Sequence, residues 1–399
     1  MSEEYFLDLD FSRAKLTEEE IKVCEEKIVK LETPSFATYS PDFSSLKELS
    51  EKYPDKKNII IEGNGGSIST IRAFASCLDT QGKNVFLLDT DDPDYLSEIK
   101  RKCEATDTLL IVTSKSGESI NAIADYLALR DYDTVFVTGE KGALYEIARS
   151  ENVPVLNHPE ISGRFSGITE CALFPAAMLG MDATEIARGA QIMYARCAPD
   201  SPFANNPALR LAMHLDKLEK MSYDEVFLSI YSKKLTGYFE LITQLFHESV
   251  CKGGKGQTIY GGEAPENQHH TLQRFNSGKR NSVGFFMTIK DFDDNISLTV
   301  PEELKSIKCR NIELGQLEKM SLSDIIHTEF EGTWKDTIEE NIPAIHLELQ
   351  RLTPSSAGML TAFFQYAAFY SSILRDVAPF NQPGVEKSKE YIFQLIKEK

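Results

Sequence analysis

Two short loops rich in glycine and serine carry residue types that could bind an anion. One is GNGGS (63–67), and the other is SKSGES (114–119). Each follows an apolar run typical of a buried strand and leads into a stretch with helical spacing. Helix N-termini point backbone amides outward, so the loops together predict a phosphate-binding site. The residues expected to donate hydrogen bonds to the phosphate are Gly66, Ser67, Ser114, Lys115, Ser116 and Ser119.

These two loops have a less specific interpretation as well. Glycine and serine are common in strand-to-helix turns that bind nothing. Neither loop completes a G-x-G-x-x-G dinucleotide fingerprint or a Walker motif. The ligand expected here is therefore a small phosphate-bearing molecule and not a nucleotide cofactor.

A carboxylate stands in the middle of the second loop, at Glu118. A carboxylate aimed at a phosphate would repel it. We therefore expect Glu118 to point away from the anion and to cap the helix that starts there, where an acidic group is favoured. If Glu118 faced the anion instead, substrate affinity would be weak or the ligand would not be a phosphate.

The loops need a scaffold, and the apolar runs predict one. Five such runs occupy the first half, at 58–61, 84–89, 108–113, 134–139 and 153–157, and three more follow at 225–232, 283–289 and 344–350. Continuous apolar runs that alternate with helices indicate parallel sheets buried on both faces. In a flavodoxin-like strand order the first and third strands are neighbours, which brings the two loops to one edge.

The fold expected is α/β, with two three-layer αβα domains of flavodoxin-like type. Pro354 suits the start of a long helix that runs to about Arg375. The predicted parts are an N-terminal helical arm (1–45), a first domain with the phosphate loops (46–198), a second domain (199–376) and a C-terminal tail with a short helix (377–399).

Composition excludes several classes of protein. The chain has 399 residues, 42% of them hydrophobic, and a net charge of −18. Such an acidic chain is a poor binder of nucleic acid or anionic membranes, and no apolar run is long enough to span a bilayer. The acidic N-terminus predicts no signal peptide, and seven isolated cysteines favour reduced thiols. We expect a cytoplasmic protein without a metal or a cofactor.

Five segments in order resemble the phosphoglucose isomerase family, in the sugar-isomerase (SIS) fold class. They are GNGGSIST, SKSGES, SGRFSGITECALFP (162–175), QLFHES (244–249) and PFNQPGVEKSK (379–389). The last segment is long and very specific, whereas the first two are shared by many phosphosugar binders. The resemblance covers roughly 55–395 and implies two SIS-type domains.

The resemblance also implies roles for individual residues. Glu248 takes the place of the base that moves a proton between C2 and C1, and Arg164 that of the arginine that steadies the enediolate. His269 takes the place of the ring-opening histidine, and Lys389 that of the lysine near the ring oxygen. Gln382 falls on a fixed position of the substrate-binding motif. The family works typically as a dimer, in which His269 would complete the partner's site.

The residue types suit aldose–ketose isomerisation. A partly buried carboxylate can move a proton between adjacent carbons, and a fixed cation stabilises the enediolate more than the neutral sugar. Glu248 ends an apolar-rich helical run, so partial burial is plausible. Glu263 and Glu266 are reserve bases, and His270 is a second candidate for ring opening.

The segments depart from the family pattern at several positions, which are Asn64, Glu118, Asn121, Ser162, Glu170, Cys171 and His247. The function expected is the interconversion of glucose 6-phosphate and fructose 6-phosphate. The alternatives are an isomerase that also accepts mannose 6-phosphate and a non-catalytic phosphosugar sensor. A sensor would have no reason to keep the base, the arginine, the histidine and the lysine together.

Overall fold

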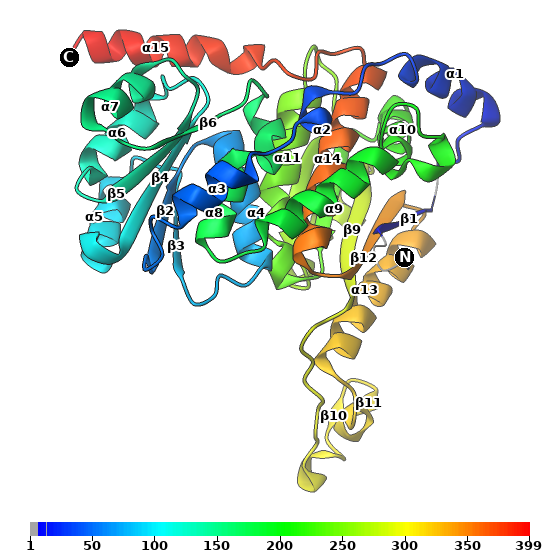
Figure 1. Ribbon diagram of the computed structural model, residues 1–399. Helices are drawn as coiled ribbons and strands as arrows, with labels where there is room; N and C mark the ends of the chain where they lie inside the picture. Colours follow the sequence, from blue (N-terminus) through cyan, green and yellow to red (C-terminus); the bar gives the residue numbers. More distant parts are fainter. Residues whose placement is uncertain (1–6, 13) are drawn as a thin grey trace. The chain divides into compact units, whose positions relative to one another are not determined.

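The computed structural model describes residues 7–12 and 14–399 (Figure 1). The chain forms two compact units, each assembled from segments that are not contiguous in sequence. Unit 1 contains the described residues up to Lys15, together with Ser222–Thr236 and Ile259–Thr353. Unit 2 contains Leu16–Met221, Gly237–Thr258 and Pro354–Lys399. Both units are α/β, as the alternation of apolar runs and helical stretches predicts.

Unit 2 is built on a five-stranded sheet in the order β3-β2-β4-β5-β6. Its strands are β2 (Asn58–Glu62), β3 (Asn84–Leu88), β4 (Thr108–Ser114), β5 (Asp133–Thr138) and β6 (Val155–Asn157). All neighbouring strands run parallel. The flavodoxin-like order is confirmed, because β2 and β4 pair directly, with Glu62 opposite Val112. The two glycine- and serine-containing loops therefore leave adjacent strands at the same edge.

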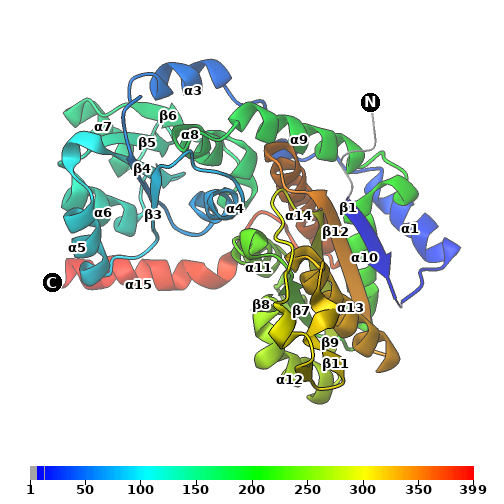
Figure 2. The ribbon, with the colours of Figure 1, turned by 90° about the horizontal axis from the view of Figure 1, so that it is seen from below.

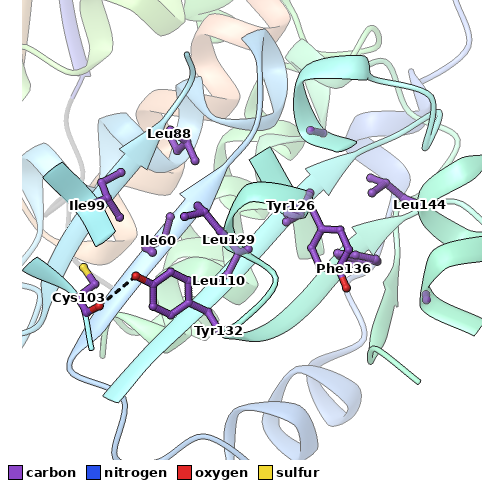
Figure 3. Packing of buried hydrophobic residues seen from close by; sticks show 13 residues of the cluster. Ile60, Leu88, Ile99, Cys103, Leu110, Tyr126, Leu129, Tyr132, Phe136 and Leu144 are labelled. Atoms are coloured by element: carbon purple, nitrogen blue, oxygen red, sulfur yellow. Dashed lines mark hydrogen bonds between the residues drawn. The ribbon is translucent and has the colours of Figure 1, made fainter. Parts of the chain in front are cut away.

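Helices cover this sheet because its strands are apolar on both faces. Figure 3 shows one face, where Ile60, Leu110 and Phe136 pack against Tyr126 and Leu144 from the covering helices. Those helices are α5 (Pro93–Lys102), α6 (Ile120–Leu129) and α7 (Ala143–Glu151). The remaining helices of the unit are α1 (Glu18–Ile28), α2 (Ser35–Thr38), α3 (Phe43–Ser50), α4 (Ser69–Cys77), α8 (Glu170–Met178), α9 (Ala183–Arg196), α10 (Pro207–Lys220), α11 (Tyr238–Val250), α14 (Pro354–Leu374) and α15 (Glu386–Lys397).

Two short 3₁₀ segments join strands to helices near the predicted phosphate site. They are η1 (Gly65–Ser67) and η3 (Gly163–Ile168). Helix α14, predicted from Pro354 onward, packs against α9, α10 and α11 inside unit 2. Its close contact with α9 depends on glycine, since a Cβ on Gly358 would lie 1.8 Å from the Ile186 carbonyl oxygen. Helix α9 precedes residue 198, where the first predicted domain ends, and helices α10, α11 and α14 follow it. All four helices pack together in unit 2.

Unit 1 is built on a second five-stranded sheet in the order β1-β12-β9-β7-β8 (Figure 2). Its strands are β1 (Leu7–Phe11), β7 (Glu225–Ile230), β8 (Thr258–Glu263), β9 (Ser282–Asp291) and β12 (Ala344–Arg351). Strands β7, β9 and β12 run parallel, as predicted. Its helices are α12 (Thr271–Ser277) and α13 (Leu322–Glu339), and a small hairpin of β10 (Lys308–Cys309) and β11 (Ile312–Glu313) extends away from the sheet of this unit (Figure 1).

Two strands of unit 1 differ from the sequence-based expectation. The segment predicted as a helical arm contains β1, which pairs antiparallel with β12, so this sheet is not wholly parallel. Strand β8 was not predicted, because Gly261 and Gly262 interrupt its pattern. Gly261 is required there, since its φ is +126° and a Cβ would lie 2.1 Å from the Leu228 carbonyl oxygen.

Candidate active site

The GNGGS loop lies in direct backbone contact with the segment that carries Arg164. A Cβ on Gly66 would lie 2.1 Å from the carbonyl carbon of Gly163. Gly65 has a φ of +57°, and a Cβ there would lie 2.8 Å from Gln244 Nε2 and 3.9 Å from Glu248 Oε1. Side chains at these two positions would push the loop away. Because Gly65 and Gly66 have no side chains, the backbone predicted to bind phosphate can lie next to the predicted base, Glu248.

Arg164 is the centre of a hydrogen-bond network in unit 2. Its Nη1 donates to Glu248 Oε2 at 3.0 Å, and its Nε donates to Ser249 Oγ at 2.7 Å. Its Nη2 donates to the carbonyl oxygens of Pro379 at 2.5 Å and Asn381 at 3.0 Å. The guanidinium group is almost fully buried, which lowers the pKa of Arg164, while Glu248 raises it. A buried cation of this kind is stable because its donors have fixed acceptors.

Glu248 is held from two sides. Besides the ion pair with Arg164, its Oε1 accepts a hydrogen bond from Gln244 Nε2 at 2.8 Å. The two residues lie four positions apart on α11 and therefore on the same face of this helix. The Glu248 side chain is 29% exposed, so the carboxylate is positioned and still reachable. This arrangement can accept and return a proton at a fixed place.

Lys252 follows one turn after Glu248. Its Nζ donates to the carbonyl oxygen of Ala378. Burial, the largest effect, and the Arg164 guanidinium group together lower the pKa of Lys252 to about 8, against Glu248 and Cys251, which raise it. The sequence analysis missed Gln244, Ser249 and Lys252 as members of the site. The spacing of four residues on one helix could have indicated Gln244, whereas Lys252 lies beyond the end of α11 and gives no such signal.

The SKSGES loop is packed against the loop that follows β5. The carbonyl oxygen of Ser114 accepts from Thr138 Oγ1 at 2.7 Å, and that of Gly117 accepts from the Leu144 amide at 3.0 Å. Ser114 is buried, whereas Ser116 is exposed and Ser119 is partly exposed. Both accessible serines lie at the end of the sheet where the GNGGS loop also begins.

Glu118 lies two residues before α6, but its carboxylate accepts a hydrogen bond from a different helix. Its Oε1 accepts a hydrogen bond at 3.2 Å from the amide of Ala143, the first residue of α7. The prediction that Glu118 caps the helix that starts there, α6, is therefore wrong, since the carboxylate caps α7. The amides at the start of α7 lack partners within their helix and attract a negative charge. The Glu118 carboxylate thus interacts with the N-terminus of α7.

Lys115 of the same loop is engaged by an acidic neighbour. Its Nζ lies 3.1 Å from Glu160 Oε2, and Lys141 Nζ lies 3.5 Å from the other oxygen of this carboxylate. The Glu160 side chain is 74% exposed, so this pair is screened by water and weak. A phosphate dianion could therefore compete for the Lys115 ammonium group.

The C-terminal motif is anchored at its beginning and exposed at its end. Phe380 lies edge-on to Phe165 at 5.2 Å and stacks on Phe369 at 5.9 Å between ring centroids. After Gln382 the chain enters α15, all of whose described residues are exposed. Lys389 on α15 pairs with Glu386 at 3.1 Å. The ion pair of Lys389 is therefore with a residue of its own helix and not with the Arg164 network.

The predicted ring-opening histidine belongs to unit 1. His269 is exposed, and its side chain makes no hydrogen bond or ion pair with any residue that the structure describes. His270 is occupied, since its Nε2 lies 2.7 Å from Glu266 Oε2. The other reserve base, Glu263, pairs with Lys233 at 2.5 Å. Of the two adjacent histidines, His269 has the ring that is available to a ligand. In residues 7–12 and 14–399, no group of three His, Cys, Asp or Glu side chains is arranged to hold a metal ion.

Solved structures of known proteins share this fold. The structure superposes on a hypothetical protein from Thermus thermophilus with a TM-score of 0.84 and 21% identity, covering 94% of both chains. It also matches a glucose-6-phosphate isomerase from Chlamydia trachomatis with a TM-score of 0.79 and 17% identity, covering 98% of this chain and 88% of the other. The fold is therefore that of the SIS-type phosphosugar isomerases.

Among the SIS-type phosphosugar isomerases, the sequence is similar to proteins named as glucose-6-phosphate isomerases. The chain is 28% identical to a probable glucose-6-phosphate isomerase of Haloarcula marismortui, over 89% of this chain and 82% of the relative. It is 28% identical to the glucose-6-phosphate isomerase of Fusobacterium nucleatum, over 90% of this chain and 84% of the relative. No family model matches the chain. The predicted resemblance to the phosphoglucose isomerase family is confirmed by these relatives.

Proposed function

We propose that the protein interconverts glucose 6-phosphate and fructose 6-phosphate, a reaction of glycolysis and gluconeogenesis, through a cis-enediolate. The observation that carries this proposal is the ion pair of Arg164 and Glu248, which lies against the glycine loop at Gly65 and Gly66. Relatives of similar length named as glucose-6-phosphate isomerases support the choice of substrate.

Glu248 is the proposed base. Its carboxylate takes the proton from one of the two carbons C1 and C2 and returns it to the other, so no net proton is consumed. Gln244 and Arg164 fix both oxygens, which keeps the carboxylate in one orientation during the transfer. The adjacent guanidinium group stabilises the negative enediolate more than the neutral sugar.

The loops around the base hold the phosphate group of the substrate in this proposal. The amide of Gly66 and the hydroxyl groups of Ser67, Ser116 and Ser119 are its donors, with Lys115 released from Glu160 as a cation. Binding at the phosphate, far from the reacting carbons, anchors the substrate and places those carbons against the base.

Ring opening requires an acid and a base near O1 and O5, and we assign these roles to His269 and Lys389. We also propose a homodimer in the cytoplasm, in which His269 completes the site of the neighbouring subunit. Mixing two inactive variants, Glu248→Gln and His269→Ala, tests this assembly. Subunit exchange should restore activity, because a mixed dimer contains one complete site. Persistent inactivity of a mixture with proven exchange would exclude the shared site.

A coupled assay tests the activity directly. Purified protein in excess chelator receives fructose 6-phosphate, and a dehydrogenase specific for glucose 6-phosphate reports the product. We expect product formation, and a loss of roughly 10²-fold or more with Glu248→Gln, since the base is removed while the shape is kept. Mannose 6-phosphate is measured in the same samples. Full activity of the variant would move the base elsewhere, and predominant mannose 6-phosphate formation would contradict the proposed specificity.

A further inference from the structure

Lys252 lies at the point where α11 meets the C-terminal segment. It follows the C-cap residue of this helix, Cys251, and is only partly exposed. Its ammonium group donates to the carbonyl oxygen of Ala378, which is 126 positions away in the chain. The bond is charge-assisted, and such bonds are stronger than those between neutral groups.

The same segment is held by Arg164, a few residues further along. Lys252 binds the carbonyl oxygen of Ala378, and Arg164 binds those of Pro379 and Asn381. Two cations therefore fix the backbone that leads into Gln382 and α15. Because Arg164 also binds Glu248, the position of this backbone and the orientation of the base are linked.

Three groups with charge or the ability to titrate face the Lys252 ammonium group. Arg164 comes from η3, Glu248 from α11, and Cys251 from the end of α11. The segment Ala378–Asn381 contributes carbonyl groups but no charged side chain. Burial and the neighbouring guanidinium group together bring the pKa of Lys252 to about 8, so this amine can lose its proton within the range in which isomerases are assayed.

We infer that Lys252 is a positioning residue of the site, whose ammonium group fastens Ala378 to the end of α11 and keeps the Arg164–Glu248 pair aligned only while it carries its proton. The inference rests on the isomerase activity proposed above. When the proton leaves, the bond to Ala378 loses its charge assistance and the Glu248 carboxylate loses a neighbouring positive charge. Activity therefore decreases on the alkaline side of neutrality.

The test is the dependence of kcat/KM on pH for three proteins. For the unmodified protein we expect an alkaline decrease with a midpoint near pH 8. Lys252→Arg keeps a positive donor that does not deprotonate in this range, so the decrease near that pH should disappear. Lys252→Gln should lower kcat/KM about tenfold or more at neutral pH, because a hydrogen bond from a charged donor is lost.

A matched control is available in the same loop. Lys255 Nζ donates to the carbonyl oxygen of Arg375 at 2.5 Å, in the same C-terminal stretch. Lys255→Arg should therefore keep the alkaline decrease at its original pH. A Lys252→Arg variant that keeps the original decrease, or a Lys252→Gln variant as active as the unmodified protein, would overturn the inference.

A second measurement does not depend on catalysis. Lysines are labelled by reductive ¹³C-methylation, and their signals are followed by NMR during a pH titration. A signal that titrates near pH 8 and is absent from the folded Lys252→Arg variant would support the assignment. Assignment of Lys252 to a signal that titrates in the ordinary lysine range would refute it. If the unmodified protein isomerised neither sugar, the proposed function would fail while this titration still decided the state of Lys252.

Discussion

Arg164 illustrates how much a single buried side chain can organise. It binds a base, a serine hydroxyl group and two backbone carbonyls, and these acceptors come from two segments distant in sequence. The resemblance of SGRFS to a family segment predicts a site role for this residue, and that role stays a prediction. The motif could not predict the acceptors at Pro379 and Asn381. These acceptors are backbone carbonyl oxygens, which every residue has, so their positions cannot be recognised from the pattern of side chains.

Glu118 gives a prediction at the scale of one side chain. Its carboxylate is occupied by the Ala143 amide, so its charge should have little effect on a bound phosphate. Glu118→Gln keeps an acceptor and should leave KM for fructose 6-phosphate within about twofold. Glu118→Ala loses the cap, worth roughly 1 kcal/mol, and should raise KM a few-fold as the loop loosens. Steady-state kinetics decides, and a large decrease of KM in either variant would mean that Glu118 faces the phosphate.

Secondary structure elements were predicted with uneven success, for physical reasons. The three central strands of the first sheet, β2, β4 and β5, are continuous apolar runs buried along nearly their whole length, which is the clearest signal in a sequence. Strand β8 carries two glycines and gives no such signal. Strand β1 is five residues long and pairs antiparallel at an edge, where its partner β12 lies more than 300 residues away, and local pattern does not encode that pairing.

The contact between η1 and η3 gives a prediction for whole elements. Gly66→Ala introduces a methyl group 2.1 Å from the carbonyl carbon of Gly163 and 2.2 Å from the amide nitrogen of Arg164, and these are backbone atoms that cannot move aside as a flexible side chain would. We expect a loss of about 1–3 kcal/mol in the free energy of unfolding and a large loss of kcat/KM, because η3 carries Arg164. Denaturant unfolding and the coupled assay measure both quantities.

Gly332→Ala is the matched control for this experiment. Gly332 lies within α13, and no described atom lies within 4 Å of a Cβ placed there. This substitution should stabilise the protein by up to about 1 kcal/mol, since alanine favours helices over glycine. A Gly66→Ala variant that is as stable and active as the control would show that η1 and η3 are not in the contact described.

At the scale of the whole molecule, the most unusual electrostatic feature is a pair of buried acids in unit 2. Glu62 is fully buried at the end of β2, and neither of its oxygens has a hydrogen-bond partner among the described residues. Burial, with Asp125 and Asp91 nearby, raises its pKa well above the ordinary value. Burial likewise raises the pKa of Asp125 to about 7.

This pair makes stability depend on pH. A carboxyl group with a raised pKa holds its proton longer in the folded state than in the unfolded state. For Asp125, the contribution of the protonated carboxyl group to the free energy of unfolding is complete below its ordinary pKa of 3.8. This contribution is lost as the pH rises through the folded-state pKa of about 7. Between about pH 5.5 and pH 8, Asp125 should therefore cost the protein on the order of 2 kcal/mol.

Asp125→Asn tests this statement, because it removes the titration and keeps the shape. The variant should lose less stability than the unmodified protein over the same interval, measured by urea unfolding at both pH values. Comparing differences within each protein cancels the cost of the new amide and the titration of groups that Asp125 does not affect. Glu62 changes in the expected direction as well, because the Asp125 charge that helps to raise its pKa is removed. Equal losses in both proteins would show that Asp125 keeps an ordinary pKa.

The bonds from Arg164 to Pro379 and Asn381 have a consequence for biosynthesis. These carbonyls lie 215 and 217 positions after the arginine, near the end of the chain. Arg164 therefore lacks these two acceptors until residues 379–381 have been synthesised and have left the ribosome, and contacts of such long range also slow folding. A nascent chain that stops before Pro379 contains the base and the glycine loop but cannot complete the network around them. If the site has the activity proposed above, a truncated product of this kind contains the base without the hydrogen bonds that hold the arginine beside it.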